Sequence, residues 1–281
     1  MKILRTKEEV NDALRIERNH NKTIGLVPTM GALHDGHLQL VEKSKSYSDI
    51  TISSIYVNPT QFNNSADLEK YPRPVENDLK LFEESGVDYV FLPSDVEIYP
   101  QTVLTKFDFG DLERILEGEF RPGHFNGVGI VVSKLFNIVQ PDHAYFGQKD
   151  LQQLSVIRRL VKDLSYKIEL IQVPTIRERD GLAMSSRNAR LNDEERQTAV
   201  ILYTCLSYAK DELLKGKDWF EVREKVTQRF MTEPLARLEY FELVLADTLE
   251  KTNTVAGHES LAICTAAFIG EVRLIDNLMI N

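Results

Sequence analysis

The feature that most constrains the fold is an alternation of short β-branched runs with helical stripes between residues 23 and 173. Five such runs predict strands, at residues 23–27, 50–57, 87–92, 144–146 and 167–173. Between them, apolar residues at helical spacing predict helices near residues 37–45, 75–82, 128–139 and 151–161. Strands that alternate with helices predict a parallel sheet with right-handed crossovers. We therefore expect an α/β fold.

The pattern changes past residue 190. Asn192 followed by Glu195 forms a capping-box-like helix start, and Asp218 can cap a second helix. Three later runs predict strands linked by turns, at residues 239–245, 260–268 and 272–276. A proline and an arginine-rich stretch interrupt both patterns near residue 176. We expect a Rossmann-like domain with flanking helices at 1–175 and a smaller C-terminal α+β domain at 176–281.

Composition excludes several classes of protein. With 281 residues the chain can bury a large core without covalent staples, and Cys205 and Cys264 lack metal-binding spacing. We expect two buried thiols and a cytoplasmic location. No apolar stretch approaches about 18 residues and the N-terminus is polar, which predicts neither a membrane span nor a signal peptide. The net charge of −9 disfavours a nucleic-acid partner, although four arginines gather at 177–190.

Residues 28–37, Pro-Thr-Met-Gly-Ala-Leu-His-Asp-Gly-His, lie where a predicted strand ends and a helix begins. Ligands gather at such junctions because exposed amides and the helix dipole attract anions. Gly31 and Gly36 permit close backbone approach, and His34 and His37 share one helix face. Both imidazoles would then stabilise charge on a phosphate during nucleotidyl transfer. An isolated pair of this kind also suits two surface histidines, or a zinc site that lacks its third ligand.

This segment resembles the HIGH-type signature of the nucleotidyltransferase superfamily, in the form carried by the pantothenate synthetase family, the pantoate–β-alanine ligases. The resemblance continues in order and spans nearly the whole chain. Its further blocks are YVNPTQF at 56–62, YPR at 71–73, RPGHF at 121–125, FGQKD at 146–150, MSSRN at 184–188 and RLIDN at 273–277.

The resemblance implies an AMP-forming ligase of pantothenate and coenzyme A biosynthesis. Pantoate would attack ATP to give pantoyl adenylate and pyrophosphate, and the amine of β-alanine would then displace AMP to give pantothenate. It also implies a homodimer that uses ATP as substrate with Mg²⁺, and no membrane or nucleic-acid partner. The domain at 1–175 would bind nucleotide and pantoate. Because an acyl adenylate hydrolyses, we expect the C-terminal domain, through its arginine-bearing loop, to close over bound ATP.

The resemblance assigns roles block by block. The catalytic role falls on His37, with His34 assisting at the phosphates and Lys149 as a point charge for phosphate. Gln61 would hold pantoate and β-alanine and Gln153 pantoate, with Asn58 and Arg121 as further candidates for that pocket. The residues assigned to ATP are Pro28, Thr29, Met30, Gly31, Ala32, Leu33, His34, Asp35, Gly36, His37, Gly147, Gln148, Lys149, Asp150, Ile176, Met184, Ser185, Ser186 and Arg187.

Plainer interpretations of three of these residues stay open on sequence alone. Asp150 also suits an acidic helix start, Gln153 a solvated helix face and Gln61 a turn. After the YPR block, where the family commonly has paired acids, the chain has Asn77 and Asp78. Asp78 is therefore the candidate protein ligand for Mg²⁺, which ATP phosphates and water would mostly coordinate.

Two rival functions remain. One is an adenylyltransferase that uses the same two histidines but stops at an adenylylated product. The other is an RNA-binding or synthetase-like module, suggested by the histidine motif and the Ser-Ser-Arg sequence and opposed by the net charge of −9.

Overall fold

The computed structural model describes residues 1–280. The chain divides into two compact units. Unit 1 comprises Met1–Gln148 and Val156–Pro174, and unit 2 comprises Lys149–Ser155 and the chain from Thr175 onward. The assignment of functional domains to residues 1–175 and 176–281 stays a prediction.

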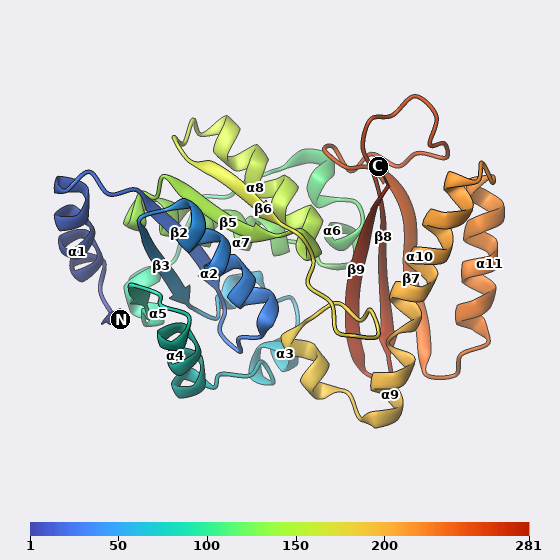
Figure 1. Cartoon of the computed structure of the whole chain (residues 1–281), viewed down its shortest axis with the longest axis horizontal. Coiled ribbons are helices and arrows are strands. Elements are labelled where there is room, and N and C mark those ends of the chain that lie inside the picture. The colour runs from blue at the N-terminus through green and yellow to red at the C-terminus, as the bar shows by residue number, and fades with distance from the viewer. Residues whose placement is uncertain (281) are drawn as a thin grey trace. The chain divides into compact units, whose positions relative to one another are not determined.

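Unit 1 is built on a six-stranded parallel sheet (Figure 1). The strand order is β1-β4-β3-β2-β5-β6. From β2 the chain proceeds outward through β3 to β4 and then returns to the other side of β2 with β5 and β6. The order therefore reverses between β2 and β5, which is where ligands bind in open α/β sheets. The strands are β1 (Lys2–Leu4), β2 (Ile24–Thr29), β3 (Ile50–Ile55), β4 (Tyr89–Phe91), β5 (His143–Gly147) and β6 (Glu169–Val173).

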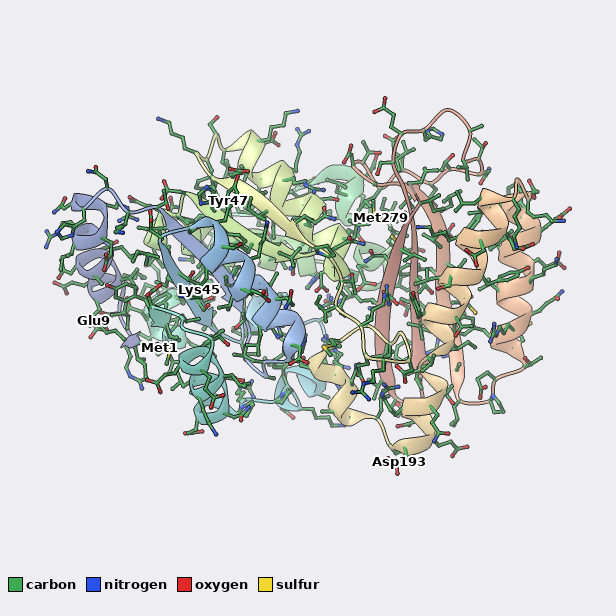
Figure 2. All side chains as sticks on the ribbon, viewed as in Figure 1. Met1, Glu9, Lys45, Tyr47, Asp193 and Met279 are labelled. Carbon is green, nitrogen blue, oxygen red and sulfur yellow. The ribbon has the colours of Figure 1, made fainter. Side chains whose placement is uncertain are left out.

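Helices and short turns connect these strands. Helix α2 contacts β2, β3 and β5. Lys45 lies on α2 near its end (Figure 2). Its Nζ donates to the carbonyl oxygen of Gly86 at 2.6 Å. The longer helices are α1 (Lys7–Asn19), α2 (Asp35–Tyr47), α4 (Val75–Glu84), α7 (His124–Val139) and α8 (Leu151–Asp163). The shorter ones are η1 (Pro59–Gln61), α3 (Ser65–Glu69), α5 (Asp95–Ile98), η2 (Gly110–Glu113), α6 (Glu117–Phe120) and η3 (Gln148–Asp150).

The burial of unit 1 follows from its sequence. Strand β2 contributes Ile24, Leu26 and Val27, each without exposed surface, as expected for a parallel sheet covered on both faces. Helix α7 is strongly apolar, and twelve of its sixteen residues are buried. Its polar residues Asn126, Ser133, Lys134 and Asn137 share one side of the helix and are partly or fully exposed. The wide apolar remainder of α7 forms part of the core.

Unit 2 is an antiparallel three-stranded sheet with helices packed on it (Figure 1). Helix α10 contacts β8 and β9, while α11 contacts β7. In its core Trp219 stacks on Phe241, with ring centroids 5.8 Å apart. The elements are η4 (Ser186–Arg190), α9 (Asp193–Thr198), α10 (Ile201–Leu214), α11 (Trp219–Met231), β7 (Ala236–Leu245), β8 (Leu261–Ile269) and β9 (Val272–Ile280).

The predicted fold class is confirmed, and so are the two caps predicted for the C-terminal helices. Asn192 and Glu195 form a full capping box, and Asp218 accepts the Phe220 N–H at 2.9 Å. Strand β1 and helix α1 were not predicted, because β1 has three residues and α1 is largely polar. None of the helices formed by residues 1–280 is long and apolar enough to cross a membrane.

Candidate active site

The loop between β2 and α2 carries the HIGH-type segment. Gly31 and Ala32 follow one another with φ of +77° and +51°, both in the left-handed region. A Cβ at Gly31 would lie 2.7 Å from Oδ2 of Asp78, so only glycine fits there. Ala32 adopts a conformation that non-glycine residues rarely take, and such strain persists only where the surroundings impose it.

Asp78 on α4 imposes that conformation. Its Oδ2 accepts the N–H of Ala32 and its Oδ1 accepts the N–H of Leu33, both at 2.8 Å. The side chain is fully buried, and burial raises the pKa of Asp78 while the two backbone hydrogen bonds oppose that rise. The structure therefore makes Asp78 an anchor for the loop.

His34 and His37 together form the N-terminal cap of α2. Nδ1 of His34 accepts the N–H of Gly36 at 3.1 Å, and Nδ1 of His37 accepts the N–H of His34 at 3.3 Å. A backbone N–H is always a donor, so each neutral ring carries its proton on Nε2. The ring centroids lie 4.1 Å apart. The cap thus holds two Nε2–H donors at the positive end of the helix dipole.

Asn58 and Gln61 form a buried amide network beside this loop. Nδ2 of Asn58 donates to Oε1 of Gln61 at 3.1 Å, and Nε2 of Gln61 donates to the sulfur of Met30 at 3.2 Å. The Tyr99 hydroxyl donates to Oδ1 of Asn58 at 2.8 Å. Asn58 is 1% exposed and Gln61 8% exposed. These bonds fix which way the Gln61 amide faces and place its nitrogen at the loop.

The start of α7 supports the same segment. A Cβ at Gly127 would lie 2.4 Å from the carbonyl oxygen of Thr60, so glycine permits the close approach of α7 and η1. The buried ring of His124 donates from Nδ1 to the carbonyl oxygen of Gln61 at 2.7 Å. Arg121 pairs with the buried Glu117 at 3.6 Å. His124 of the RPGHF block therefore holds the Gln61 turn in place.

A cavity of about 310 Å³ opens at the carboxyl ends of β2, β3 and β4. Met30, Tyr56 and Asp78 line it, together with Arg73 and Asp95. Burial and the nearby Asp95 carboxylate raise the pKa of Tyr56, so its hydroxyl stays protonated. The cavity adjoins the anchor of the HIGH-type loop and has both apolar and charged walls.

Within unit 2, residues 176–184 form a hairpin and η4 (Ser186–Arg190) follows it; the two together are named the 176–190 hairpin. The N–H of Met184 donates to the carbonyl oxygen of Ile176 at 3.0 Å. The backbones of Arg177 and Ala183 form an antiparallel β-bridge. The hydroxyl of Ser185 accepts the N–H of Arg187 at 3.3 Å. The hairpin therefore presents the Met-Ser-Ser-Arg sequence at a defined turn.

Lys149 and Gln153 belong to the short segment that joins unit 2. Lys149 lies in η3 with its side chain 18% exposed, and its Nζ is 4.0 Å from Oδ1 of Asp150. Its carbonyl oxygen accepts Nδ2 of Asn277 at 2.9 Å. Gln153 is half-buried in α8. In unit 1, Oε1 of Gln148 accepts Nε2 of Gln172 at 3.3 Å.

The structure thus gathers the predicted residues into two groups. Unit 1 joins the 28–37 loop to Asn58 and Gln61 through Met30, and unit 2 joins Lys149 to the 176–190 hairpin through the end of β9. Sequence reasoning gave no specific role to several residues that hold these groups in place. They are Tyr99, His124, Arg177, Asp276 and Asn277, and the available signal was that three of them lie in the RPGHF and RLIDN blocks.

Known proteins match the chain over nearly its full length. The profile of the pantoate–β-alanine ligase family matches residues 2–279. The chain belongs to this family. It is 47% identical to the pantothenate synthetase of Acetivibrio thermocellus over 282 residues, and 48% identical to that of Thermosipho africanus over 280 residues, with 100% of each chain covered.

Solved structures of the family agree. The pantothenate synthetase of Thermus thermophilus matches with a TM-score of 0.92 and 41% identity, covering 99% of each chain. The pantoate–β-alanine ligase of Francisella tularensis, solved in complex with β-γ ATP and β-alanine, matches with a TM-score of 0.81 and 37% identity. That match covers 99% of this chain and 97% of the other. The family resemblance drawn from the sequence blocks is confirmed.

Proposed function

We propose that the protein condenses (R)-pantoate with β-alanine at the expense of ATP, forming pantothenate, AMP and pyrophosphate through pantoyl adenylate. The observation that carries the proposal is the full-length agreement with pantoate–β-alanine ligases, one of which was solved with β-γ ATP and β-alanine. The position of the histidine cap supports it, because the cap follows β2, where the strand order reverses.

In the first step a carboxylate oxygen of pantoate attacks the α-phosphorus of ATP, and the bond to the pyrophosphate oxygen breaks. Negative charge builds on the α-phosphate oxygens. Nε2–H of His34 and of His37 would donate to those oxygens, and preorganised donors stabilise such charge without reorganising. Lys149, Ser185, Ser186 and Arg187 would bind the departing phosphates.

In the second step the neutral amine of β-alanine attacks the acyl carbon, the bond to AMP breaks and the amine loses a proton. The Gln61 amide offers donors and an acceptor for the hydroxyl and carboxylate groups of the two acids. Asn58 orients that amide, while Gln153 and Arg121 are assigned to pantoate by the family resemblance. Water would hydrolyse the adenylate, so we propose that the 176–190 hairpin closes over bound ATP.

Mg²⁺ fits this scheme as an ion that is bound to the phosphates of ATP. Phosphate oxygens and water meet most of its coordination. Within residues 1–280 there is no cluster of three or more His, Cys, Asp or Glu side chains that would hold a metal ion. Asp78 already binds two backbone N–H groups. We therefore propose that Mg²⁺ enters bound to the triphosphate, and that Asp78 serves first as the loop anchor.

We also propose a cytoplasmic homodimer. Cys205 and Cys264 are both buried, and Cys205 is a free thiol, which suits a reducing compartment. Burial raises the pKa of Cys205 to about 11, which keeps that thiol unreactive. Light scattering after gel filtration measures the mass in solution, and a mass near 32.2 kDa would contradict the dimer.

One experiment tests the reaction. The protein is incubated with ATP, Mg²⁺, pantoate and a series of amines, and the products are identified by mass spectrometry. We expect AMP and pantothenate with β-alanine, and pyrophosphate without any amine. If an adenylylated compound accumulates whether or not an amine is present, the protein is an adenylyltransferase and the proposed ligase activity is wrong.

A further inference from the structure

The RLIDN block at residues 273–277 has no part in the proposed chemistry. Its last two residues, Asp276 and Asn277, lie on β9 and are 4% and 3% exposed. Burying a carboxylate and an amide costs free energy unless partners satisfy them. The partners of these two side chains therefore indicate what the block does.

Asp276 pairs with Arg177 at the base of the 176–190 hairpin. The salt bridge is bidentate: Nη1 of Arg177 lies 2.6 Å from Oδ2 of Asp276, and Nη2 lies 2.9 Å from Oδ1. The same guanidinium donates to the carbonyl oxygens of Gly181 and Asn277, each at 3.0 Å. It also lies 4.2 Å from the ring centre of Tyr203. This geometry fixes the base of the hairpin to β9, because a planar guanidinium that makes two parallel hydrogen bonds to one carboxylate can rotate little.

Asn277 reaches the segment around Lys149, to which the proposed function also assigns ATP phosphates. Its Nδ2 donates to the carbonyl oxygen of Lys149 at 2.9 Å, while its own N–H donates to Oδ1 of Asp276 at 2.7 Å. Burial raises the pKa of Asp276, and both the Arg177 guanidinium and the Lys149 ammonium act to lower it. Electrostatics and hydrogen bonds thus link residues 149–150, named here the Lys149 turn, with β9 and the 176–190 hairpin in one network.

We propose that Asp276 and Asn277 are positioning residues that set the spacing between the Lys149 turn and the 176–190 hairpin. The inference rests on the proposed function, which assigns ATP phosphates to both segments. Neither residue touches substrate in this scheme; each acts through the backbone of a segment that does. A fixed spacing matters because displacing a positioned group by about 1 Å can reduce a rate about a hundredfold.

The test replaces Asn277 with its closest isostere. Asn277→Asp keeps the shape but turns the donor towards Lys149 into a carboxylate oxygen that repels the carbonyl. Glu239→Gln is the matched control, because Glu239 pairs with Arg273 on the same sheet at 2.5 Å and is also largely buried. Asn277→Ala, which removes the amide without adding charge, is the second variant. Thermal unfolding of all three gives the loss of stability.

Three measurements separate positioning from a structural role. For Asn277→Asp we expect about tenfold weaker Mg·ATP binding by calorimetry, which corresponds to about 1.4 kcal/mol. We expect a similar loss of kcat/KM for ATP in pantoate-dependent pyrophosphate exchange, with Asn277→Ala between this variant and the wild type. The KM for β-alanine should not change, and Glu239→Gln should bind Mg·ATP like the wild type.

Binding and exchange by Asn277→Asp that match Glu239→Gln at comparable melting temperatures would overturn the inference. A uniform loss that raises the KM for β-alanine as much as that for ATP would also overturn it. A wild-type protein that binds Mg·ATP but makes no pantoyl adenylate would overturn the proposed function instead, and the calorimetric comparison would still decide the positioning role.

Discussion

At the scale of single residues, the two histidines of the HIGH-type loop have a structural task and, in the proposed reaction, a chemical one. Nδ1 of each accepts a backbone N–H, and this capping contact determines which nitrogen carries the proton. The capping atom and the proposed phosphate donor therefore lie at opposite sides of one imidazole ring. A substitution that retains one end and removes the other separates the two tasks.

His34→Asn makes that separation. Asparagine is a good N-cap, so we expect unfolding by urea to stay near that of the wild type, whereas His34→Ala should cost about 1 kcal/mol. Both variants lose the Nε2–H donor, so pyrophosphate exchange should fall by about a hundredfold or more in each. Exchange that survives in His34→Asn would show that the ring matters only as a cap.

Asp78 allows a second prediction at this scale. In Asp78→Asn one oxygen still accepts a backbone N–H, but the amide nitrogen faces the other N–H as a second donor. Leaving that buried group unsatisfied should cost about 1–3 kcal/mol in denaturant unfolding and weaken ATP binding. Glu76→Gln, an exposed change on the same helix, is the control. Equal stability of the two variants would contradict the anchor.

At the scale of elements, the sequence predicted five of the six parallel strands, the two C-terminal caps and the placement of the HIGH-type loop. Hydrophobic periodicity and capping residues are local signals in the sequence, and these elements form where the signals predict them. The distant partners of Asp78, Arg177 and Asn277 could not be predicted, because each lies 45 or more residues away in the chain. Residue spacing shows that a carboxylate is present, but not which backbone it reaches.

The tip of the 176–190 hairpin gives a pH prediction. Arg196 on α9 lies 2.5 Å from Glu178 and 2.9 Å from Asp180, and it lowers the pKa of Asp180 below 3.8. A lowered native pKa gives stability that is present above the unfolded value and lost as pH falls through the native one.

Arg196→Gln should therefore destabilise the protein by less than about 1 kcal/mol at pH 7, since the pair is partly exposed and screened by solvent. The difference from the wild type should shrink as the pH falls below 3.8. Urea midpoints measured between pH 7 and pH 3 check it. A difference that stays constant across that range would mean that Asp180 does not gain its stability from Arg196.

At the scale of the whole molecule, the reversal of strand order between β2 and β5 means that two predicted site segments, 28–37 and 147–150, begin at the ends of neighbouring strands. That placement follows from topology alone. The family match over residues 2–279 shows that the chain belongs to the pantoate–β-alanine ligases, and the chemical roles of the two segments are part of the proposed function. The fold and the activity could therefore be predicted best from the sequence, and the contacts that support the candidate site could be predicted least.

ATP binding should change the exchange of amide hydrogens in the 176–190 hairpin. We expect residues 184–188 to become protected when Mg·ATP saturates the protein, because closure would shield their backbone from water. The helix α10 amides should change little and serve as the internal reference. Exchange of 184–188 that is the same with and without nucleotide would contradict closure.

The path of the backbone limits how such proteins can be recombined. The chain leaves unit 1 after Gln148, returns at Val156 and leaves again after Pro174. Cutting a gene once near residue 175 therefore separates Lys149–Ser155 from the rest of its unit. A chimaera between two family members should keep its stability only when residues 149–155 come from the same parent as the C-terminal half. In a library of crossover points, the stable chimaeras should therefore carry both segments from one parent.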